Sequence, residues 1–276
     1  MRLSLVACLL AIACARPREA EVQGLRVVSL VPSATEVVFA LGAGDNLVGA
    51  TRYCTRPAKA RLVKRVGGLL DVSVEAVLGA RPDVVIGSRA VLQGRLAEVL
   101  SGAGVRLVPV WFEKMGDVGP SILAIGEAIG RREEAMALIR AMEQDLANLA
   151  GRAARTPPTR VLFVVGKNPL VVAGPGSFIG ELLGRMGVAN VVPDGLTAYP
   201  TWSFEQVLRS DPDVVVDGAV EAEGLKSVLE DLGLRAAVEG RVIRLDDDAV
   251  LRPGPTSARA ALDLALAILF AMGGGR

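Results

Sequence analysis

The stretch SVEAVLGARPDVVIG, residues 73–87, returns 130 residues later as SFEQVLRSDPDVVVD, residues 203–217. Aligned without a gap, the two stretches share eight of their fifteen letters. In each, a serine is a suitable cap for a short helix, the letters Pro-Asp end that helix, and a run of valines follows that is typical of a buried parallel strand. A helix–strand unit written twice predicts two lobes built on the same plan.

Three further pairs of segments occur in the same order in the two halves of the chain. They are RVVSLV and RVLFVV, LGAGDNLVG and MGVANVVPD, and GVRLVPV and GRVIRL. Short β-branched runs that alternate with helical patterns indicate α/β lobes with mostly parallel sheets. We therefore expect strands near 26–31, 47–50, 83–87 and 105–110 in the first lobe, and near 160–165, 170–173, 190–192, 213–217 and 241–245 in the second. The helix after the first strand is expected to start near PSATEVVFALG, with Ser33 or Thr35 as its cap, and to end at Gly42.

Between the two lobes lies a long segment with helical periodicity. Its apolar residues recur at spacings of three and four, and it contains no proline. We expect one helix of roughly 30 Å at 132–155, which links an N-terminal lobe at 22–131 to a C-terminal lobe at 156–276. If one continuous helix links the lobes, we expect their relative motion to be limited. The alternative interpretation of this segment is a routine crossover helix.

The composition excludes several classes of protein. The chain has 276 residues, a formal net charge of +1 with its basic residues spread out, and no histidine. We therefore expect no nucleic-acid partner, no metal site that needs imidazole, and no Ser-His-Asp triad. Aromatic residues make up only 4% of a chain that is 51% apolar, so the core must be aliphatic.

The first residues, MRLSLVACLLAIACARPRE, are typical of a secretory signal. The apolar run is too short to span a bilayer as a helix. A cysteine closes the run, which resembles a bacterial lipoprotein signal at 1–14 with Cys14 as the lipidated residue; Cys8 fits the motif letters better but leaves too short an apolar region. We expect a periplasmic or extracytoplasmic protein with a lipid anchor, ordinary secretion being the alternative. Cys54 has no obvious disulfide partner.

The repeated stretches each carry a glutamate, Glu75 and Glu205, two residues after the serine. A carboxylate in the first turn of a helix interacts favourably with the helix dipole, so each glutamate alone is ordinary. Neither completes a capping box, which requires the acid three residues after the serine. Ligands of α/β folds bind beyond the carboxyl ends of the strands, which helix N-termini face. Two lobes joined by a rod would therefore form a cleft with one carboxylate on each rim.

The chain resembles the periplasmic substrate-binding proteins of ABC importers for cobalamin, iron-siderophores and haem, with the cobalamin-binding branch closest. The resemblance covers residues 25–270 and implies two Rossmann-like lobes joined by one long α-helix. It also implies a corrinoid ligand held between the lobes and an ABC permease dimer with its ATPase as partner. In that family two rim glutamates pair with arginines of the permease, and the resemblance gives this role to Glu75 and Glu205. The segments that carry it are RVVSLVPSATEVVFALGAGDNLVG, TRYCTRPAKARLVKRVGG, SVEAVLGARPDVVIG, YPTWSFEQVLRSDPDVVV and RPGPTSARA.

Loops at the expected strand ends offer the candidate ligand contacts. A flat macrocycle such as a corrin or porphyrin binds well between apolar rings with a few polar anchors, and arginines suit carboxylate or phosphate groups. Trp202 is less suited to contact the ligand than Tyr53 and Tyr199, since it can pack beneath the docking helix, which carries Glu205. Some cobalamin binders use tryptophans at positions that are Gly67 or Gly68 and Ser88 in this chain. The expected ligand-binding residues are Ser33, Thr35, Arg52, Tyr53, Ser88, Arg89, Asn168, Tyr199 and Arg252.

Three alternatives to a corrinoid carrier stay open. Tyr53 can coordinate ferric haem, so a haem or ferric-siderophore carrier on the same scaffold is the main one. A two-lobed α/β enzyme such as a glycosyltransferase is disfavoured, because no glycine-rich phosphate loop follows the first strand and no histidine is available as a base. The third is a surface interaction module without a small ligand. We expect no catalytic residue, no cofactor and no metal site of the protein's own.

Overall fold

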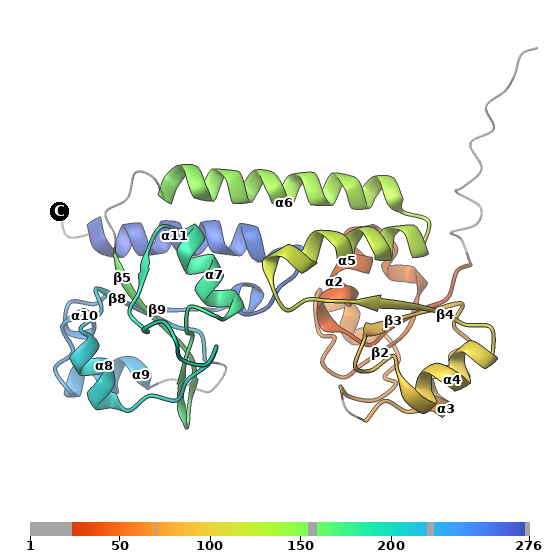
Figure 1. The fold of residues 1–276 in the computed structure, drawn as a ribbon, viewed down its shortest axis with the longest axis horizontal. Helices are drawn as coiled ribbons and strands as arrows, with labels where there is room; N and C mark the ends of the chain where they lie inside the picture. The colour runs from red at the N-terminus through yellow and green to blue at the C-terminus, as the bar shows by residue number, and fades with distance from the viewer. Residues whose placement is uncertain (1–23, 70, 154–158, 220–223, 274–276) are drawn as a thin grey trace, which may run out of the picture.

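The computed structural model describes residues 24–69, 71–153, 159–219 and 224–273, which form two α/β lobes (Figure 1). In the N-terminal lobe four parallel strands follow the order β2-β1-β3-β4. The elements of this lobe are β1 (Val27–Ser29), α2 (Pro32–Ala40), η1 (Gly44–Asn46), β2 (Leu47–Ala50), η2 (Ala58–Leu62), α3 (Val74–Gly79), β3 (Val84–Ser88), α4 (Gly94–Gly102), β4 (Arg106–Val110) and α5 (Met115–Ala128).

The C-terminal lobe repeats this plan with one additional strand. Strand β5 pairs in parallel with β7 and β8, β8 pairs in parallel with β9, and β6 is antiparallel to β5. The elements are β5 (Arg160–Lys167), β6 (Leu170–Val172), α7 (Phe178–Arg185), β7 (Ala189–Asn190), α8 (Phe204–Ser210), β8 (Val214–Asp217), α9 (Leu225–Asp231), α10 (Arg235–Val238), β9 (Val242–Arg244), η3 (Ala249–Leu251) and α11 (Ser257–Gly273).

The strand orders show that the chain contains a structural repeat. The order β7-β5-β8-β9 in the second lobe matches β2-β1-β3-β4 in the first. Each of the four pairs of similar sequence segments therefore falls on an equivalent strand. The predicted fold class, two lobes with mostly parallel sheets joined by a helix, is confirmed.

Hydrogen bonds at the strand ends explain several of the repeated letters. The backbone N–H of Arg26 donates to the Asp83 carboxylate over 2.7 Å, and that of Arg160 donates to Asp213 over 2.9 Å. Both arginine guanidinium groups also donate to a backbone carbonyl at the end of the short helix that precedes the aspartate, which is α3 in the first lobe and α8 in the second. The repeated arginine and Pro-Asp letters therefore attach β1 to the start of β3 in the first lobe and β5 to the start of β8 in the second.

The repeated serines cap their helices as expected. Ser73 Oγ accepts the N–H of Ala76 over 3.1 Å, and Ser203 Oγ accepts the N–H of Gln206 over 3.2 Å. In the second lobe Gln206 also accepts the N–H of Ser203, which completes a capping box. The spacing of Glu205 did not predict this box, because the glutamine that follows it supplies the returning side chain.

The cap expected for the first helix is wrong. Ser33 and Thr35 lie inside α2, whose N-cap is Val31, without a side-chain hydrogen bond. Pro32 occupies the first helical position, where its fixed φ and missing N–H cost nothing, and this places both hydroxyl residues within the first turns. The expected end at Gly42 is confirmed, since its φ of +73° is the left-handed conformation favoured after a helix.

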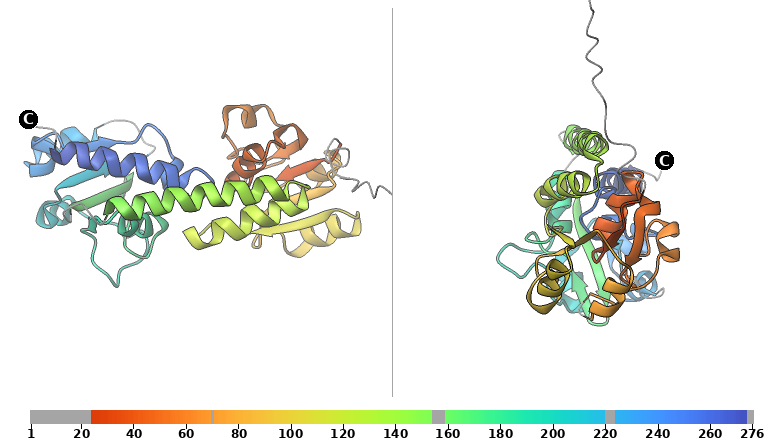
Figure 2. Two further views of the ribbon diagram at one scale, coloured as in Figure 1. Left: turned by 90° about the horizontal axis from the view of Figure 1, so that it is seen from above. Right: turned by 90° about the vertical axis from the view of Figure 1, so that its right-hand side faces the viewer.

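Helix α6 (Arg132–Ala153) carries the chain from one lobe to the other. Residues 154 and 155 of the expected helix lie outside the described residues. Helix α6 runs along one side of the molecule and packs against α5 of the first lobe and α11 of the second (Figures 1 and 2). Its buried Met142 and Leu149 belong to an apolar core that includes residues of both lobes. The connector is thus packed along its length.

Two glycines of α5 allow a test of this packing. A Cβ at Gly126 would meet Ala135 and lie 2.8 Å from the Arg131 carbonyl oxygen, where α6 joins α5, whereas a Cβ at Gly119 has its nearest neighbour at 4.0 Å. We expect G126A to lower the free energy of unfolding by about 1–3 kcal/mol through overpacking. G119A should raise it by about 0.5–1 kcal/mol through helix propensity. Urea unfolding followed by circular dichroism measures both, and equal effects would contradict the close packing.

Candidate functional site

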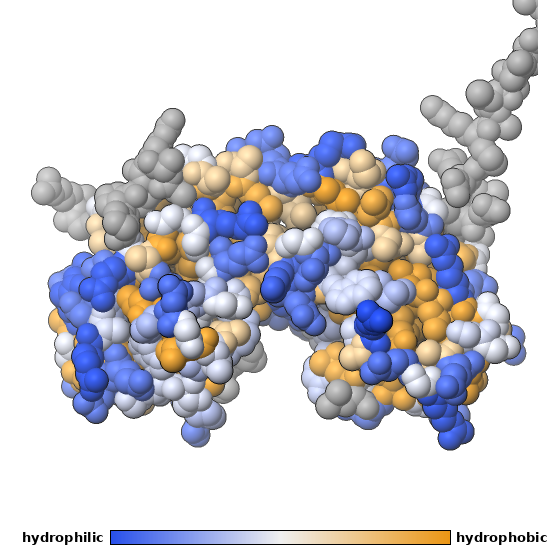
Figure 3. All heavy atoms as spheres, in the orientation of Figure 1, coloured by the Kyte–Doolittle hydropathy of each residue, from blue (hydrophilic) through white to orange (hydrophobic). Residues whose placement is uncertain are grey.

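The two lobes face each other across a hollow on the side of the molecule away from α6 (Figure 3). The arrow of β4 points toward the C-terminal lobe (Figure 1), so the carboxyl ends of the N-terminal strands lie on this side of their lobe. The lobes touch beside the hollow, where the Met115 N–H donates to Glu181 over 3.2 Å. Carboxyl strand ends are the usual ligand-binding edge of α/β sheets, which makes this cleft the candidate site.

Both candidate docking glutamates are exposed. Helices α3 and α8 lie toward opposite ends of the molecule, on the side away from α6 (Figure 1). The Glu205 side chain is 80% exposed and forms a surface ion pair with Arg209 at 2.7 Å. The backbone N–H of Glu75 itself and the Ser73 hydroxyl lower the pKa of Glu75, so its carboxylate stays charged. Neither glutamate contributes to a core, unlike the valines and prolines repeated beside it.

Each lobe presents one half-exposed tyrosine in a loop. Tyr53 is 48% exposed and Tyr199 is 44% exposed. The Arg52 guanidinium lies 5.5 Å from the centre of the Tyr53 ring and is paired with Asp71 at 2.8 Å. Burial raises the pKa of the Tyr199 phenol, an effect that a hydrogen bond with Ser177 partly offsets. Both rings can therefore offer an apolar face to a ligand.

The remaining expected contacts differ in accessibility. Ser88 is the last residue of β3 and is partly buried, while Arg89 directly after it is exposed. Asn168 is exposed at the turn between β5 and β6. Trp202 is 7% exposed and belongs to the same apolar cluster as Val207 of α8, so the expectation that it packs beneath the docking helix is confirmed.

Two expected ligand contacts lie away from the cleft surface. Thr35 is fully buried and donates to Ser29 Oγ over 2.8 Å. Ser33 is 5% exposed and donates to the Pro253 carbonyl of the other lobe over 2.6 Å. In this structure both hydroxyl groups already have partners, because α2 starts one residue before Ser33 and turns them into the protein. Their expected contact with a ligand stays a prediction.

Arg252 belongs to a group of charged residues where the lobes touch. Its Nη2 lies 2.9 Å from Asp248 and 3.4 Å from Glu36 of the other lobe. Arg56 and Asp247 complete the group. Of these five residues, the sequence analysis named Arg252 and missed the other four. The acid in α2, Glu36, was an available signal.

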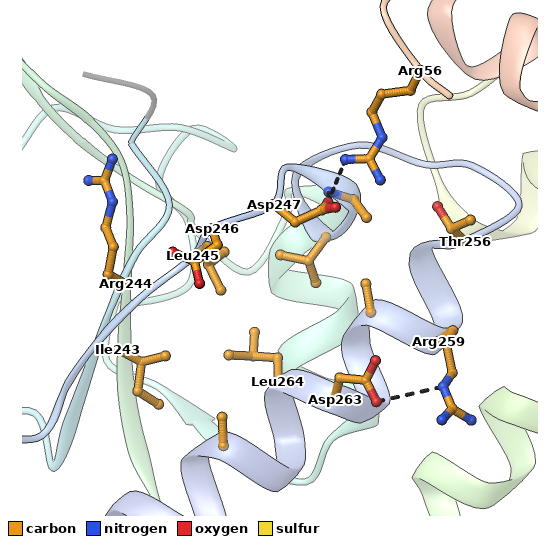
Figure 4. Close-up of a pocket in the computed structure, with 14 residues that line it drawn as sticks. Arg56, Ile243, Arg244, Leu245, Asp246, Asp247, Thr256, Arg259, Asp263 and Leu264 are labelled. Atoms are coloured by element: carbon orange, nitrogen blue, oxygen red, sulfur yellow. Dashed lines mark hydrogen bonds and ion pairs between the residues drawn. The ribbon is translucent and has the colours of Figure 1, made fainter. Parts of the chain in front are cut away.

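A cavity of about 460 Å³ lies in the C-terminal lobe between β9 and α11 (Figure 4). Its floor is aliphatic, and charged residues surround its opening. Of the N-terminal lobe, only Arg56 lines it. None of the nine expected ligand residues lines this cavity, so it is distinct from the candidate site between the lobes.

Comparison with known proteins identifies the family. Residues 27–249 match the family described as periplasmic binding protein. The chain belongs to this family. This periplasmic binding protein is 30% identical over 252 residues to an uncharacterized ABC transporter substrate-binding lipoprotein, YvrC, of Bacillus subtilis, a match that covers 88% of this chain and 79% of the relative. It is 29% identical to a vitamin B12-binding protein of Photorhabdus laumondii, covering 87% and 86% of the two chains.

Solved structures support the same assignment. The periplasmic haem-binding protein RhuT of Roseiflexus matches with a TM-score of 0.77 and 27% identity over 90% of this chain and 98% of that one. The vitamin B12-binding protein BtuF of Vibrio cholerae shares the fold with a TM-score of 0.73 and 24% identity, covering 90% and 97% of the chains. The resemblance drawn from the sequence motifs is therefore confirmed at the level of the family.

The expected signal and Cys14 lie outside the described residues. Within the ranges that the structure covers, no helix combines the length and apolar character that crossing a membrane requires. Cys54 is buried, and its Sγ lies 3.1 Å from Thr51 Oγ1. The single thiol in this part of the chain is thus a core residue.

Proposed function

We propose that this periplasmic binding protein captures a corrinoid, cobalamin-like ligand between its lobes and delivers it to the permease of an ABC importer. The observation that carries the proposal is the similarity to a vitamin B12-binding protein along nearly the full length of both chains. The half-exposed tyrosines Tyr53 and Tyr199, one in each lobe, suit the two faces of a flat macrocycle. The protein acts as a carrier, without a catalytic step.

Delivery requires docking on the permease, which we assign to Glu75 and Glu205. Two equivalent carboxylates on the two lobes match a partner with two equivalent halves, each of which would offer a cationic side chain. Lipidation of Cys14 would hold the protein at the membrane surface, where the permease and its ATPase operate. The lipoprotein name of the Bacillus subtilis relative supports this anchor.

A ligand screen tests the proposal. Calorimetry or tryptophan fluorescence on the purified protein is carried out with cyanocobalamin, cobinamide, haemin, a ferric siderophore and a nucleotide sugar. We expect tight binding of both corrinoids, because the macrocycle that they share makes the main contacts. Binding of haemin without either corrinoid would overturn the corrinoid assignment, and binding of a nucleotide sugar alone would overturn the carrier function.

Haem is the second candidate, favoured by the exposure of the Tyr53 phenol beside the Arg52 guanidinium. A phenolate can coordinate ferric iron, and the Arg52 guanidinium could pair with an acidic group of the ligand. If haem is the ligand, Y53F should remove the charge-transfer absorption of the tyrosine–iron bond. In a corrinoid carrier the same variant should change corrinoid affinity little, since the phenylalanine ring keeps the apolar face.

A further inference from the structure

Five charged residues meet where the two lobes touch. Arg56 Nη1, in the loop after β2, lies 2.5 Å from a carboxylate oxygen of both Asp247 and Asp248 in the C-terminal lobe. Arg252 Nη2 forms ion pairs with Asp248 at 2.9 Å and with Glu36 of the N-terminal lobe at 3.4 Å. Figure 4 shows Arg56 extending from one lobe to Asp247 of the other. Three ion pairs of the network therefore cross the boundary between the lobes.

Glu36 is the most enclosed carboxylate of the group. Its side chain is 10% exposed, whereas those of Asp247 and Asp248 are 60% and 41% exposed. Arg56 lies 3.9 Å from Glu36, too far for a hydrogen bond. With all five groups ionised, three negative charges face two positive ones. A proton on Glu36 would make the charges equal.

Glu36 takes up a proton more readily in this arrangement than in water. Burial raises the pKa of Glu36 above its ordinary value of 4.5, and the attraction of Arg252 and Arg56 offsets this only in part. Asp248 and Asp247 add to the rise. Separation of the lobes would hydrate the carboxylate and remove the effect.

We propose that these five residues form a proton-dependent brace that holds the lobes together beside the cleft and tightens when Glu36 is protonated. The brace joins the loop that carries Tyr53 to the segment around η3, so its state sets how far this wall of the cleft can move. The proposal concerns the protein without ligand and does not depend on which ligand it carries.

The pH window follows from the signs of the pKa shifts. The pKa of Glu36 is raised when the lobes are in contact. Its contribution to the stability of that contact is therefore complete below pH 4.5 and is lost as the pH rises through the raised pKa. For Asp247, Arg56 lowers the pKa below 3.8, so its contribution is present above 3.8 and is lost only in stronger acid. The brace should therefore loosen as the pH rises above 4.5 and through the raised pKa of Glu36.

Hydrogen exchange of the full chain, with protection corrected for intrinsic rates, tests the brace. Peptides covering 32–41 and 246–256 should be more protected at about pH 5 than at about pH 8, approaching tenfold for each unit by which the Glu36 pKa is raised. E36Q, which keeps the shape but cannot titrate, should show the same protection at both values. K226Q, which removes a surface ion pair within α9, serves as the matched control.

A second variant keeps the test decisive if E36Q folds poorly. The D247N/D248N double variant changes two exposed side chains and should reduce protection of both peptides at each pH, because Arg56 loses its partners. Equal protection of the natural protein at both pH values would overturn the proposal, as would the same pH dependence in E36Q. Unchanged protection in D247N/D248N would show that the ion pairs do not hold the lobes.

Discussion

Cells that carry the E75K/E205K variant are expected to lose uptake of the ligand, while the purified variant binds it with nearly unchanged affinity. Both side chains are exposed on short helices outside the cores of their lobes, so lysine is tolerated there. Reversal of both charges turns two attractive contacts with cationic groups of the permease into two repulsive ones. Uptake of labelled cobalamin, with calorimetry on the purified protein, measures the two effects separately.

Exposed acids on two other helices provide the control. The E98K/D231K variant makes the same change of net charge on α4 and α9. Uptake should remain close to that of the natural protein, because these residues lie outside the proposed contact. Lost affinity with normal uptake in E75K/E205K would show that the glutamates serve the ligand. An equal loss of uptake in both double variants would show that the effect comes from the change in net charge and not from the two glutamates.

Removal of either tyrosine ring, by Y53A or Y199A, is expected to weaken ligand binding by about 10- to 100-fold. Burial of an aromatic side chain against a ligand contributes about 1.5–3 kcal/mol, and each tenfold change in affinity is about 1.4 kcal/mol. Both rings are about half exposed in this structure, so their removal leaves the apolar cores intact. Calorimetric titration with the ligand found in the screen gives the change directly.

F270A is the matched control for the two tyrosines. Phe270 is an aromatic residue of α11 that is 79% exposed and lies near the C-terminal end of that helix, away from the other lobe (Figure 1). Its removal should leave affinity unchanged. Normal affinity in both Y53A and Y199A would show that the tyrosines do not form the ligand-binding walls. A fall in only one variant would place the ligand against a single lobe.

Most of the fold was predictable because its signals are local. Runs such as VVI after Pro82 and VVV after Pro212 are β-branched and continuous, which is the pattern of strands buried on both faces. Serine caps act within three residues of the helix start. The cap of α2 was wrongly predicted because Pro32 occupies the first helical position, so that the hydroxyl residues after it lie inside the helix.

The contents of the candidate site were less predictable. Loop position alone suggested Ser33 and Thr35 as ligand contacts, yet both are buried with partners already bound. Tyr53 and Tyr199 are half-exposed, as a ligand contact requires, and their roles stay predictions. The charged group around Glu36 was missed since Arg56 and Asp247 lie 191 residues apart in the chain.

The sequence by itself determined the two-lobed plan, the strand positions and the exposed pair of glutamates. Those features depend on periodicity, caps and short-range hydrogen bonds, which act between residues a few positions apart. Only the tertiary structure decided which polar residues would be buried between the lobes. The hydrogen bond from Ser33 to Pro253 spans 220 residues, and the ion pairs of Glu36 exist only after the lobes meet. Burial and ion pairing depend on distance in space, which the order of letters along the chain does not contain.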